Sequence, residues 1–258
     1  MAALAFSRAY TVEHERARDR LIVALDVGKV EEAERIVREL EGTVDYFKVG
    51  LHLQLDPALH GLIAYLLHRE KKIFLDFKAF DIPATVAGAV RASAALGVTF
   101  ITVIGQEQIV EAAVKARGNS GLKILVVTLL TGMNEKDMQR EYSTEIPMND
   151  FIVKRARFAA NEGCDGVISS AREVELIRRN VRDGFLIVTP GIRPHDAGVM
   201  NDDQKRIMTP YDAIIAGANY LVVGRPIIQQ YDRASAAERI LDEMQRALAA
   251  VADTRELA

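Results

Sequence analysis

The sequence predicts a single (β/α)8 barrel, and three observations lead to that fold class. Short apolar runs rich in β-branched residues alternate eight times with longer amphipathic stretches. No Asn-Gly or Asp-Gly turn directly joins two of the strand-like runs, so nothing indicates an antiparallel hairpin. The length of 258 residues is the usual size of a (β/α)8 barrel. Together these features favour one closed, all-parallel sheet surrounded by helices.

The strand-like runs are short and almost wholly apolar, as is typical of strands that are buried on both faces. In chain order, strands are predicted at residues 21–25, 46–49, 73–77, 100–103, 124–128, 166–168, 186–188 and 220–223.

The stretches between the runs carry apolar residues at a spacing of three and four, which is the periodicity of amphipathic helices. Helices are predicted at residues 30–40, 58–69, 85–95, 109–116, 151–161, 171–179, 210–216 and 234–249.

An open, doubly wound sheet is the alternative architecture, since it could also hold eight parallel strands. Such sheets commonly carry a glycine-rich fingerprint after the first strand, where a dinucleotide binds. This chain has DVGK at residues 26–29 instead. The barrel is therefore the preferred reading.

The composition indicates a globular protein that acts on a small molecule. Lys and Arg total 33 against 36 for Asp and Glu, giving a net charge of −3, which excludes a generally basic nucleic-acid surface. The single cysteine, Cys164, cannot form an internal disulfide and fits a cytoplasmic protein with an inert core thiol. The first residues do not read as a secretory signal, and no run is long enough to span a membrane.

The chain reads as one domain with short extensions. Residues 20–249 form the predicted barrel, residues 1–19 an N-terminal extension and residues 250–258 a C-terminal tail. Two predicted strand-to-helix connections, 129–150 and 189–208, are longer than the rest. Long connections of this kind gather at the face of a barrel where active sites form, so we expect both to act as lids.

The segment 74–85 carries the strongest chemical pattern. Side chains alternate along a strand, so Asp76 and Lys78 should point to the same face at the mouth of the barrel. Asp81 follows where the next helix should begin. Two carboxylates around one lysine keep the lysine protonated, which makes Lys78 a candidate proton donor. The alternative is a structural ion pair, with Asp81 as a helix N-cap before Pro83.

Two further strands end in charged residues. Asp26 closes the first strand and Lys48 closes the second. Either residue alone could form a rim salt bridge. With Asp76 and Lys78 they make an alternating set of acids and lysines on three successive strands, which favours a shared site.

An anion site is predicted after the last two strands. TPGIRP follows the seventh strand at residues 189–194, and VGRP follows the eighth at 223–226. The loops after strands seven and eight are the common phosphate site of this fold. Arg225 beside Gly224 suits that role, because glycine allows close approach of an anion. A surface arginine is the alternative.

The chain resembles the orotidine 5′-phosphate decarboxylase family over about residues 20–244. The resemblance rests on DFKAFDIPAT at 76–85, TPGIRP at 189–194, DQKRIMTP at 203–210 and VGRP at 223–226. It implies decarboxylation of orotidine 5′-monophosphate (OMP) to uridine 5′-monophosphate (UMP) in de novo pyrimidine biosynthesis, without a metal or cofactor.

The resemblance also implies a role for each site residue. Lys78 would donate the proton, and Asp76 would lie beside the leaving CO2; Lys48 and Asp81 complete the catalytic set. The implied substrate-binding residues are Asp26 and Lys48 at the ribose, Thr131 at the pyrimidine, and Arg193, Gln204, Gly224 and Arg225 at the phosphate. Asp81, Ile82 and Thr85 also belong to the binding set, with Asp81 and Thr85 reaching the site of a second subunit in a homodimer.

Two positions depart from the family pattern. Gly132 stands in LTGM at 130–133, where the family often has a serine that contacts the base. Ile104 stands where the fourth strand often ends in a histidine. Neither change touches the charged set, so they bear on recognition of the base rather than on the reaction.

Two other functions fit parts of the pattern. A metal-dependent ketose-phosphate lyase or decarboxylase of the same barrel type would share the D-x-K-x-x-D motif. It would have an acidic metal ligand at the end of the second strand, where this chain has Lys48, and a lysine there would repel Mg2+. A catalytically silent phosphate-binding protein would be expected to have lost one of the charged residues. The five histidines form no metal-ligand pattern.

Overall fold

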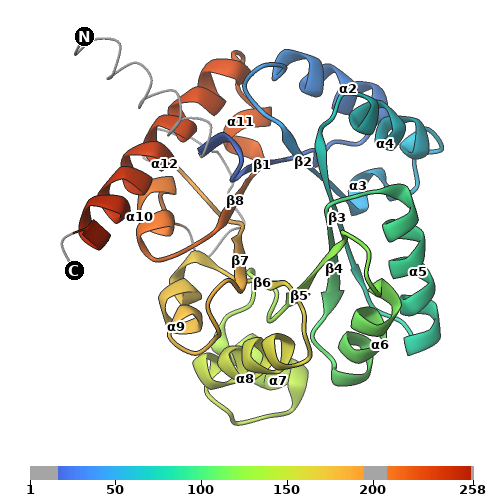
Figure 1. The fold of residues 1–258 in the computed structure, drawn as a ribbon, viewed down its shortest axis with the longest axis vertical. Helices are drawn as coiled ribbons and strands as arrows, with labels where there is room; N and C mark the ends of the chain where they lie inside the picture. The colour runs from blue at the N-terminus through green and yellow to red at the C-terminus, as the bar shows by residue number, and fades with distance from the viewer. Residues whose placement is uncertain (1–16, 195–207, 257–258) are drawn as a thin grey trace.

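The structure is a computed structural model that describes residues 17–194 and 208–256, and it is a closed barrel of eight parallel strands (Figure 1). Each strand pairs with its neighbours in chain order, and β1 pairs with β8 to close the sheet. The strands are β1 (Leu21–Ala24), β2 (Tyr46–Gly50), β3 (Lys72–Ala79), β4 (Phe100–Ile104), β5 (Lys123–Val127), β6 (Gly166–Ile168), β7 (Leu186–Thr189) and β8 (Tyr220–Val223). The predicted fold class and all eight predicted strands are confirmed.

Helices surround the barrel and cover the outer face of its sheet (Figure 1). They are α2 (Val30–Glu39), α3 (Leu51–Gln54), α4 (Leu59–His68), α5 (Pro83–Leu96), α6 (Glu107–Arg117), α7 (Glu135–Tyr142), α8 (Met148–Asn161), the 3-10 turn η1 (Ala171–Glu173), α9 (Val174–Arg178), α10 (Pro210–Ile215), α11 (Arg225–Ile228) and α12 (Arg233–Glu256). Three of them, α3, α7 and α11, were not predicted. In the described chain, no helix combines the length and apolar character needed to cross a membrane.

Helix α7 lies within the connection that the sequence predicted as a loop. Asn134 caps its first turn by accepting a hydrogen bond from the backbone N–H of Asp137, whose side chain accepts one from the backbone of Asn134 in return. This reciprocal arrangement satisfies N–H groups that the helix start leaves unpaired. Met138 is the only buried residue of α7, so the apolar periodicity that predicted the other helices is missing here.

The inside of the barrel is filled by side chains, with the largest at its amino-terminal end. Tyr46, Phe100 and Tyr220 are the first residues of β2, β4 and β8, and their rings contact one another at centroid distances of 5.2 to 5.9 Å. Alternate strands thus supply one layer, as expected for this fold. This aromatic floor fills the amino-terminal end, while Ala24 and Val127 at the other end are smaller.

Strand β3 is irregular where it reaches the mouth of the barrel. Its pairing with β4 is regular up to Leu75 opposite Ile101, and the next pair is Ala79 opposite Val103. The three residues between on β3 therefore lie opposite the single residue Thr102 on β4. Such a bulge is common beside active sites, because it re-aims side chains at the end of a strand.

Candidate active site

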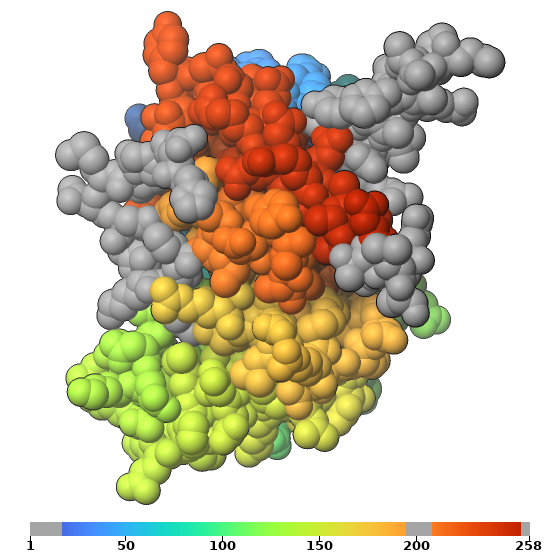
Figure 2. Space-filling model, turned by 90° about the vertical axis from the view of Figure 1, so that its left-hand side faces the viewer, coloured from blue at the N-terminus to red at the C-terminus, as the bar shows by residue number. Residues whose placement is uncertain are grey.

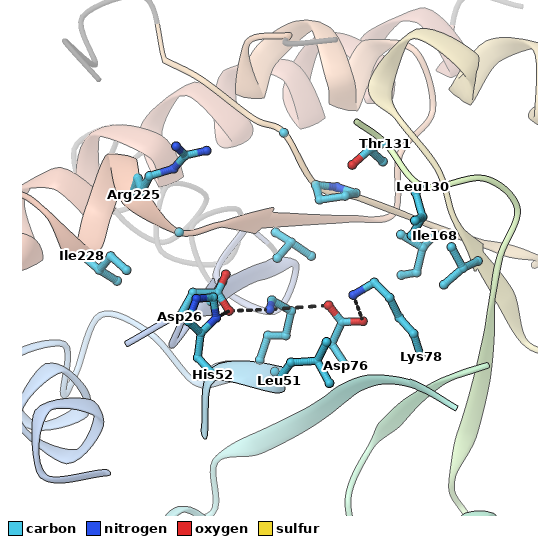
Figure 3. Close-up of a pocket in the computed structure, with 18 of the residues that line it drawn as sticks. Asp26, Leu51, His52, Asp76, Lys78, Leu130, Thr131, Ile168, Arg225 and Ile228 are labelled. Carbon is cyan, nitrogen blue, oxygen red and sulfur yellow. Dashed lines mark hydrogen bonds and ion pairs between the residues drawn. The ribbon is translucent and has the colours of Figure 1, made fainter. Parts of the chain in front are cut away.

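A cavity of about 550 Å3 opens at the carboxyl ends of the barrel strands. Its walls come from the ends of β1, β2, β3, β5, β6, β7 and β8, which are spread over the whole sequence. Eight of the residues that the sequence predicted for the site line this cavity: Asp26, Lys48, Asp76, Lys78, Thr131, Arg193, Gly224 and Arg225. Figure 3 shows Arg225 and Thr131 on opposite sides, with the aspartates and Lys78 along one wall.

The charged residues form a continuous row across the ends of β1, β2 and β3 (Figure 3). Lys48 Nζ lies 2.8 Å from Asp26 Oδ1 and 3.5 Å from Asp76 Oδ2. Lys78 Nζ lies 3.0 Å from Asp76 Oδ1. Asp76 thus stands between two ammonium groups, one on each of its oxygens.

The buried members of the row remain charged because they stabilise one another. Burial alone would raise the pKa of Asp76, but the charges of Lys48 and Lys78, with hydrogen bonds from Lys78 and Thr102, hold it below its ordinary value. Burial would likewise lower the pKa of Lys48, yet Asp76 and Asp26 hold it above its ordinary value. Both groups are therefore ionised at neutral pH.

Lys78 has an unusual backbone conformation. Its φ is 49°, in the left-handed region that residues other than glycine rarely adopt. Strain of this kind costs about 1–3 kcal/mol and tends to occur at functional sites. The sequence prediction that Asp76 and Lys78 share a face is confirmed by their contact, but regular alternation is not the cause. The bulge in β3 brings the two side chains together.

Three residues that the sequence did not single out belong to this arrangement. A Cβ at Gly50 would stand 3.0 Å from Lys48 Nζ and 3.2 Å from Asp26 Oδ1, so glycine leaves room for that ion pair. His52 lines the cavity with its Nδ1 4.0 Å from Asp26 Oδ1. Thr102 hydrogen-bonds to both Asp76 and Lys78. Of these three residues, only Gly50 could have been found from the sequence, because it lies two residues after Lys48 on the same strand.

The wall after β5 is held by an arginine from α8. Arg155 Nη1 donates a hydrogen bond of 2.9 Å to the carbonyl of Thr128, and its guanidinium stacks on Tyr142 and Phe151. This supports the chain just before Leu129, Leu130 and Thr131, which line the cavity.

The second departure from the family pattern, Ile104, packs against the apolar cluster inside the barrel.

The structure brings three of the residues predicted for an anion site, Arg193, Gly224 and Arg225, to the cavity wall formed after β7 and β8. Gly224 directly follows β8, and Arg225 begins α11. Arg193 follows β7, and its Nη1 donates a hydrogen bond of 2.9 Å to the carbonyl of Ile192. Gln204, predicted for the same end of the site, lies outside the described residues.

Asp81, Ile82 and Thr85 lie outside the cavity of their own chain and are exposed. The alternative reading of Asp81 as the N-cap of the following helix is wrong. Ile82 is the N-cap of α5, and no side chain caps this helix. Asp81 Oδ1 instead accepts a hydrogen bond of 2.6 Å from the backbone N–H of Ile82. Across residues 17–194 and 208–256, no group of three His, Cys, Asp or Glu side chains is placed to hold a metal ion.

Comparison with known proteins identifies the family. The sequence model of the "Orotidine 5'-phosphate decarboxylase / HUMPS family" matches residues 19–240. The orotidine 5′-phosphate decarboxylase of Nitrobacter winogradskyi is 44% identical over 236 residues, which cover 92% of this chain and 97% of the relative. That of Rhodopseudomonas palustris is 46% identical over 233 residues, covering 90% and 97%.

The chain belongs to the orotidine 5′-phosphate decarboxylase family.

Solved structures agree with this family assignment. The crystal structure of orotidine 5′-phosphate decarboxylase from Lactobacillus acidophilus superposes with a TM-score of 0.75 at 36% identity, covering 87% of this chain and 98% of that one. The enzyme from Pyrococcus horikoshii has a TM-score of 0.68 at 24% identity, which supports the shared fold alone. Membership of the orotidine 5′-phosphate decarboxylase family was predicted from the sequence and is confirmed.

Proposed function

We propose that this protein decarboxylates OMP to UMP and CO2, the carboxy-lyase step of de novo pyrimidine biosynthesis. The observation that carries this proposal is the row of Asp26, Lys48, Asp76 and Lys78 on the wall of the cavity. It supplies an ammonium group and a carboxylate side by side, opposite an arginine that suits a phosphate. The curated relatives that carry this activity span nearly the whole chain.

The reaction requires charge stabilisation at a carbon that has no neighbouring electron sink. When the bond from C6 of the base to the carboxylate breaks, its electron pair stays on C6 and CO2 leaves. We assign Lys78 the role of stabilising this carbanion and then giving it a proton, after which solvent reprotonates the lysine. The negative charge of Asp76 repels the carboxylate of the bound substrate. It therefore destabilises the substrate more than the transition state, in which that carboxylate is leaving as CO2.

The other binding roles are those that the family resemblance implies, and the place of these residues on the cavity wall supports them. Asp26 and Lys48 are proposed to bind the ribose, Thr131 the pyrimidine, and Gly224 and Arg225 the phosphate with Arg193. The phosphate takes no part in bond breaking, so its binding energy can be used to hold the base against Lys78. Gln204 is proposed for the phosphate end on the family resemblance alone.

Release of CO2 from OMP, measured with and without EDTA, tests the proposed reaction and its main rival. The nearest alternative is a metal-dependent ketose-phosphate lyase or decarboxylase on the same barrel, since such enzymes resemble this chain at the D-x-K-x-x-D motif of residues 76–81. Lys48, with only 8% of its surface exposed, places its ammonium between the two carboxylates that a cation would need. We expect CO2 release that EDTA leaves unchanged. Activity lost with EDTA and restored by Mg2+ would favour the rival, and binding of UMP without turnover would indicate a silent binding protein.

Replacing Arg225 with alanine should weaken ligands that carry a phosphate and hardly affect uridine. A charge-assisted contact of this kind contributes about 1.5–3 kcal/mol, so the Kd of UMP should rise roughly 10- to 150-fold. Isothermal titration with UMP and with uridine measures the difference. Arg239→Ala, which removes an exposed arginine on α12, is the matched control for loss of charge. Equal losses for both ligands would make Arg225 structural.

We further propose that the enzyme is a homodimer in which Asp81 and Thr85 of each chain complete the site of the other. Large apolar side chains are exposed after the neighbouring strands β2 and β3: Leu51 is 57% exposed, Leu55 93%, Phe80 63% and Ile82 67%. A second copy would cover these side chains, since exposed apolar patches commonly mark protein interfaces. Asp81 and Thr85 lie in the same region as Phe80 and Ile82.

A further inference from the structure

Thr102 occupies the one position of β4 that faces the bulge in β3. Regular pairing stops at Leu75 and resumes at Ala79, and Thr102 is the only β4 residue opposite the three between. A regular strand would pair the N–H of Lys78 with a backbone carbonyl. Here the side chain of Thr102 takes that place, because its Oγ1 lies 2.9 Å from the backbone nitrogen of Lys78.

The Thr102 hydroxyl makes a second hydrogen bond to the charged row. Its Oγ1 lies 3.0 Å from Asp76 Oδ1. A backbone N–H can only donate, so the hydroxyl accepts from Lys78 and its own proton is directed to Asp76. Asp76 Oδ1 therefore accepts hydrogen bonds from Lys78 Nζ and from the Thr102 hydroxyl, while Asp76 Oδ2 forms an ion pair with Lys48. One hydroxyl thus links the backbone of Lys78 to the carboxylate that its side chain contacts.

The surroundings of Thr102 keep it from moving. Its exposed fraction is 0%, and it is the next inward-facing residue above Phe100 in the aromatic floor. Threonine has a restricted side-chain torsion because its Cβ is branched. The hydroxyl is therefore held by packing below and by two hydrogen bonds above.

We propose that Thr102 is a positioning residue for the decarboxylation, acting by fixing Asp76 and the strained backbone of Lys78 relative to each other. This inference rests on the proposed function. Thr102 does not line the cavity, so it acts through its two partners rather than by contact with the substrate. Valine would fill the same space but would leave the partly buried N–H of Lys78 without its acceptor.

The test compares two pairs of variants that differ only by the hydroxyl: wild type against Thr102→Val, and Thr102→Ser against Thr102→Ala. The lost hydrogen bond to a charged group should lower kcat about 10- to 100-fold in Val and Ala, with Ser within about threefold of wild type. KM for OMP should change little, because the phosphate end is untouched. If Val fails to fold, as judged by circular dichroism, the Ser–Ala pair still decides the question.

Thr128→Val is the matched control. Thr128 is also 0% exposed, directly follows β5, and donates a hydrogen bond of 3.1 Å to the carbonyl of Ile168 on the neighbouring strand β6. This variant should lose thermal stability and keep its kcat. Suppose that the wild type is active and that kcat falls no further in Thr102→Val than in Thr128→Val. That result overturns the positioning role. An inactive wild type would instead contradict the proposed function.

The pH profile separates positioning from general destabilisation. Asp76 is faced by Lys48 from β2, by Lys78 from its own strand and by Thr102 from β4, with Asp26 beyond Lys48. Removing one hydrogen bond that lowers the pKa of Asp76 should raise that pKa. The acid limb of kcat/KM then moves to higher pH in Thr102→Val and stays in place in Thr128→Val. If the acid limb of kcat/KM moves in neither variant, the result counts against the proposal.

Discussion

Replacing Lys78 with alanine is expected to lower kcat for OMP by more than about 100-fold while the barrel stays folded. The substitution removes the only side chain assigned to both carbanion stabilisation and proton transfer. It also leaves Asp76 with one ammonium partner, Lys48, so the carboxylate remains paired and the fold survives. Steady-state CO2 release, together with circular dichroism and UMP binding, measures each part of this expectation.

Lys72→Ala is the matched control for this variant. Lys72 lies on the same strand, β3, at its opposite end, and also forms an ion pair, with its Nζ 2.6 Å from Asp19 Oδ1. Its loss should leave kcat unchanged, because the ion pair lies at the amino-terminal side of the barrel. If Lys78→Ala keeps more than about a tenth of wild-type kcat, the proton-donor role is wrong, since general acid catalysis alone contributes ~100-fold or more.

Mixing two inactive variants should restore activity if the site is shared between subunits. Lys78→Ala and Asp81→Ala homodimers should each be nearly inactive, because every site carries one lesion. After the two are unfolded and refolded together, half of the dimers are mixed. Each mixed dimer has one site with both lesions and one intact site, so about a quarter of all sites should be active. CO2 release from the mixture measures the recovery.

The same experiment excludes the alternative that Asp81 serves its own chain. In that case every site of a mixed dimer still carries one lesion, and mixing restores nothing. Native mass spectrometry confirms that mixed dimers are present. Refolded wild type serves as the reference for full recovery, and refolded single variants set the baseline. No gain over that baseline, with mixed dimers present, would contradict the shared site.

The fold could be predicted from the sequence because burial on two faces leaves a strong signal. All eight strands are short apolar runs, and the structure places them within one or two residues of the predicted ranges. The unpredicted helices lack such a signal. Helices α3 and α11 have four residues each, too few to show periodicity. Helix α7 buries one side chain and depends on the cap at Asn134.

From the pattern of residues alone, the charged part of the site could be predicted where a charged residue stands at or just after the end of an apolar strand, whereas Thr131 was predicted from the family resemblance. Asp26, Lys48 and Arg225 met that condition, and the barrel brought them to one cavity. Thr102 did not, because threonine is an ordinary strand residue and nothing in the sequence shows that β3 has extra residues opposite it. A bulge depends on pairing between strands, so it becomes visible only when the neighbouring strand is in place.

The aromatic floor closes one end of the barrel, so the cavity opens at the other end. The barrel interior below the charged row is filled by Tyr46, Phe100 and Tyr220. In the part of the chain that the structure describes, the cavity is therefore closed at its amino-terminal end. A substrate that enters this cavity must leave through the same opening, and so must both products of the proposed decarboxylation. Because the two products share one opening, whatever limits access there affects the release of both.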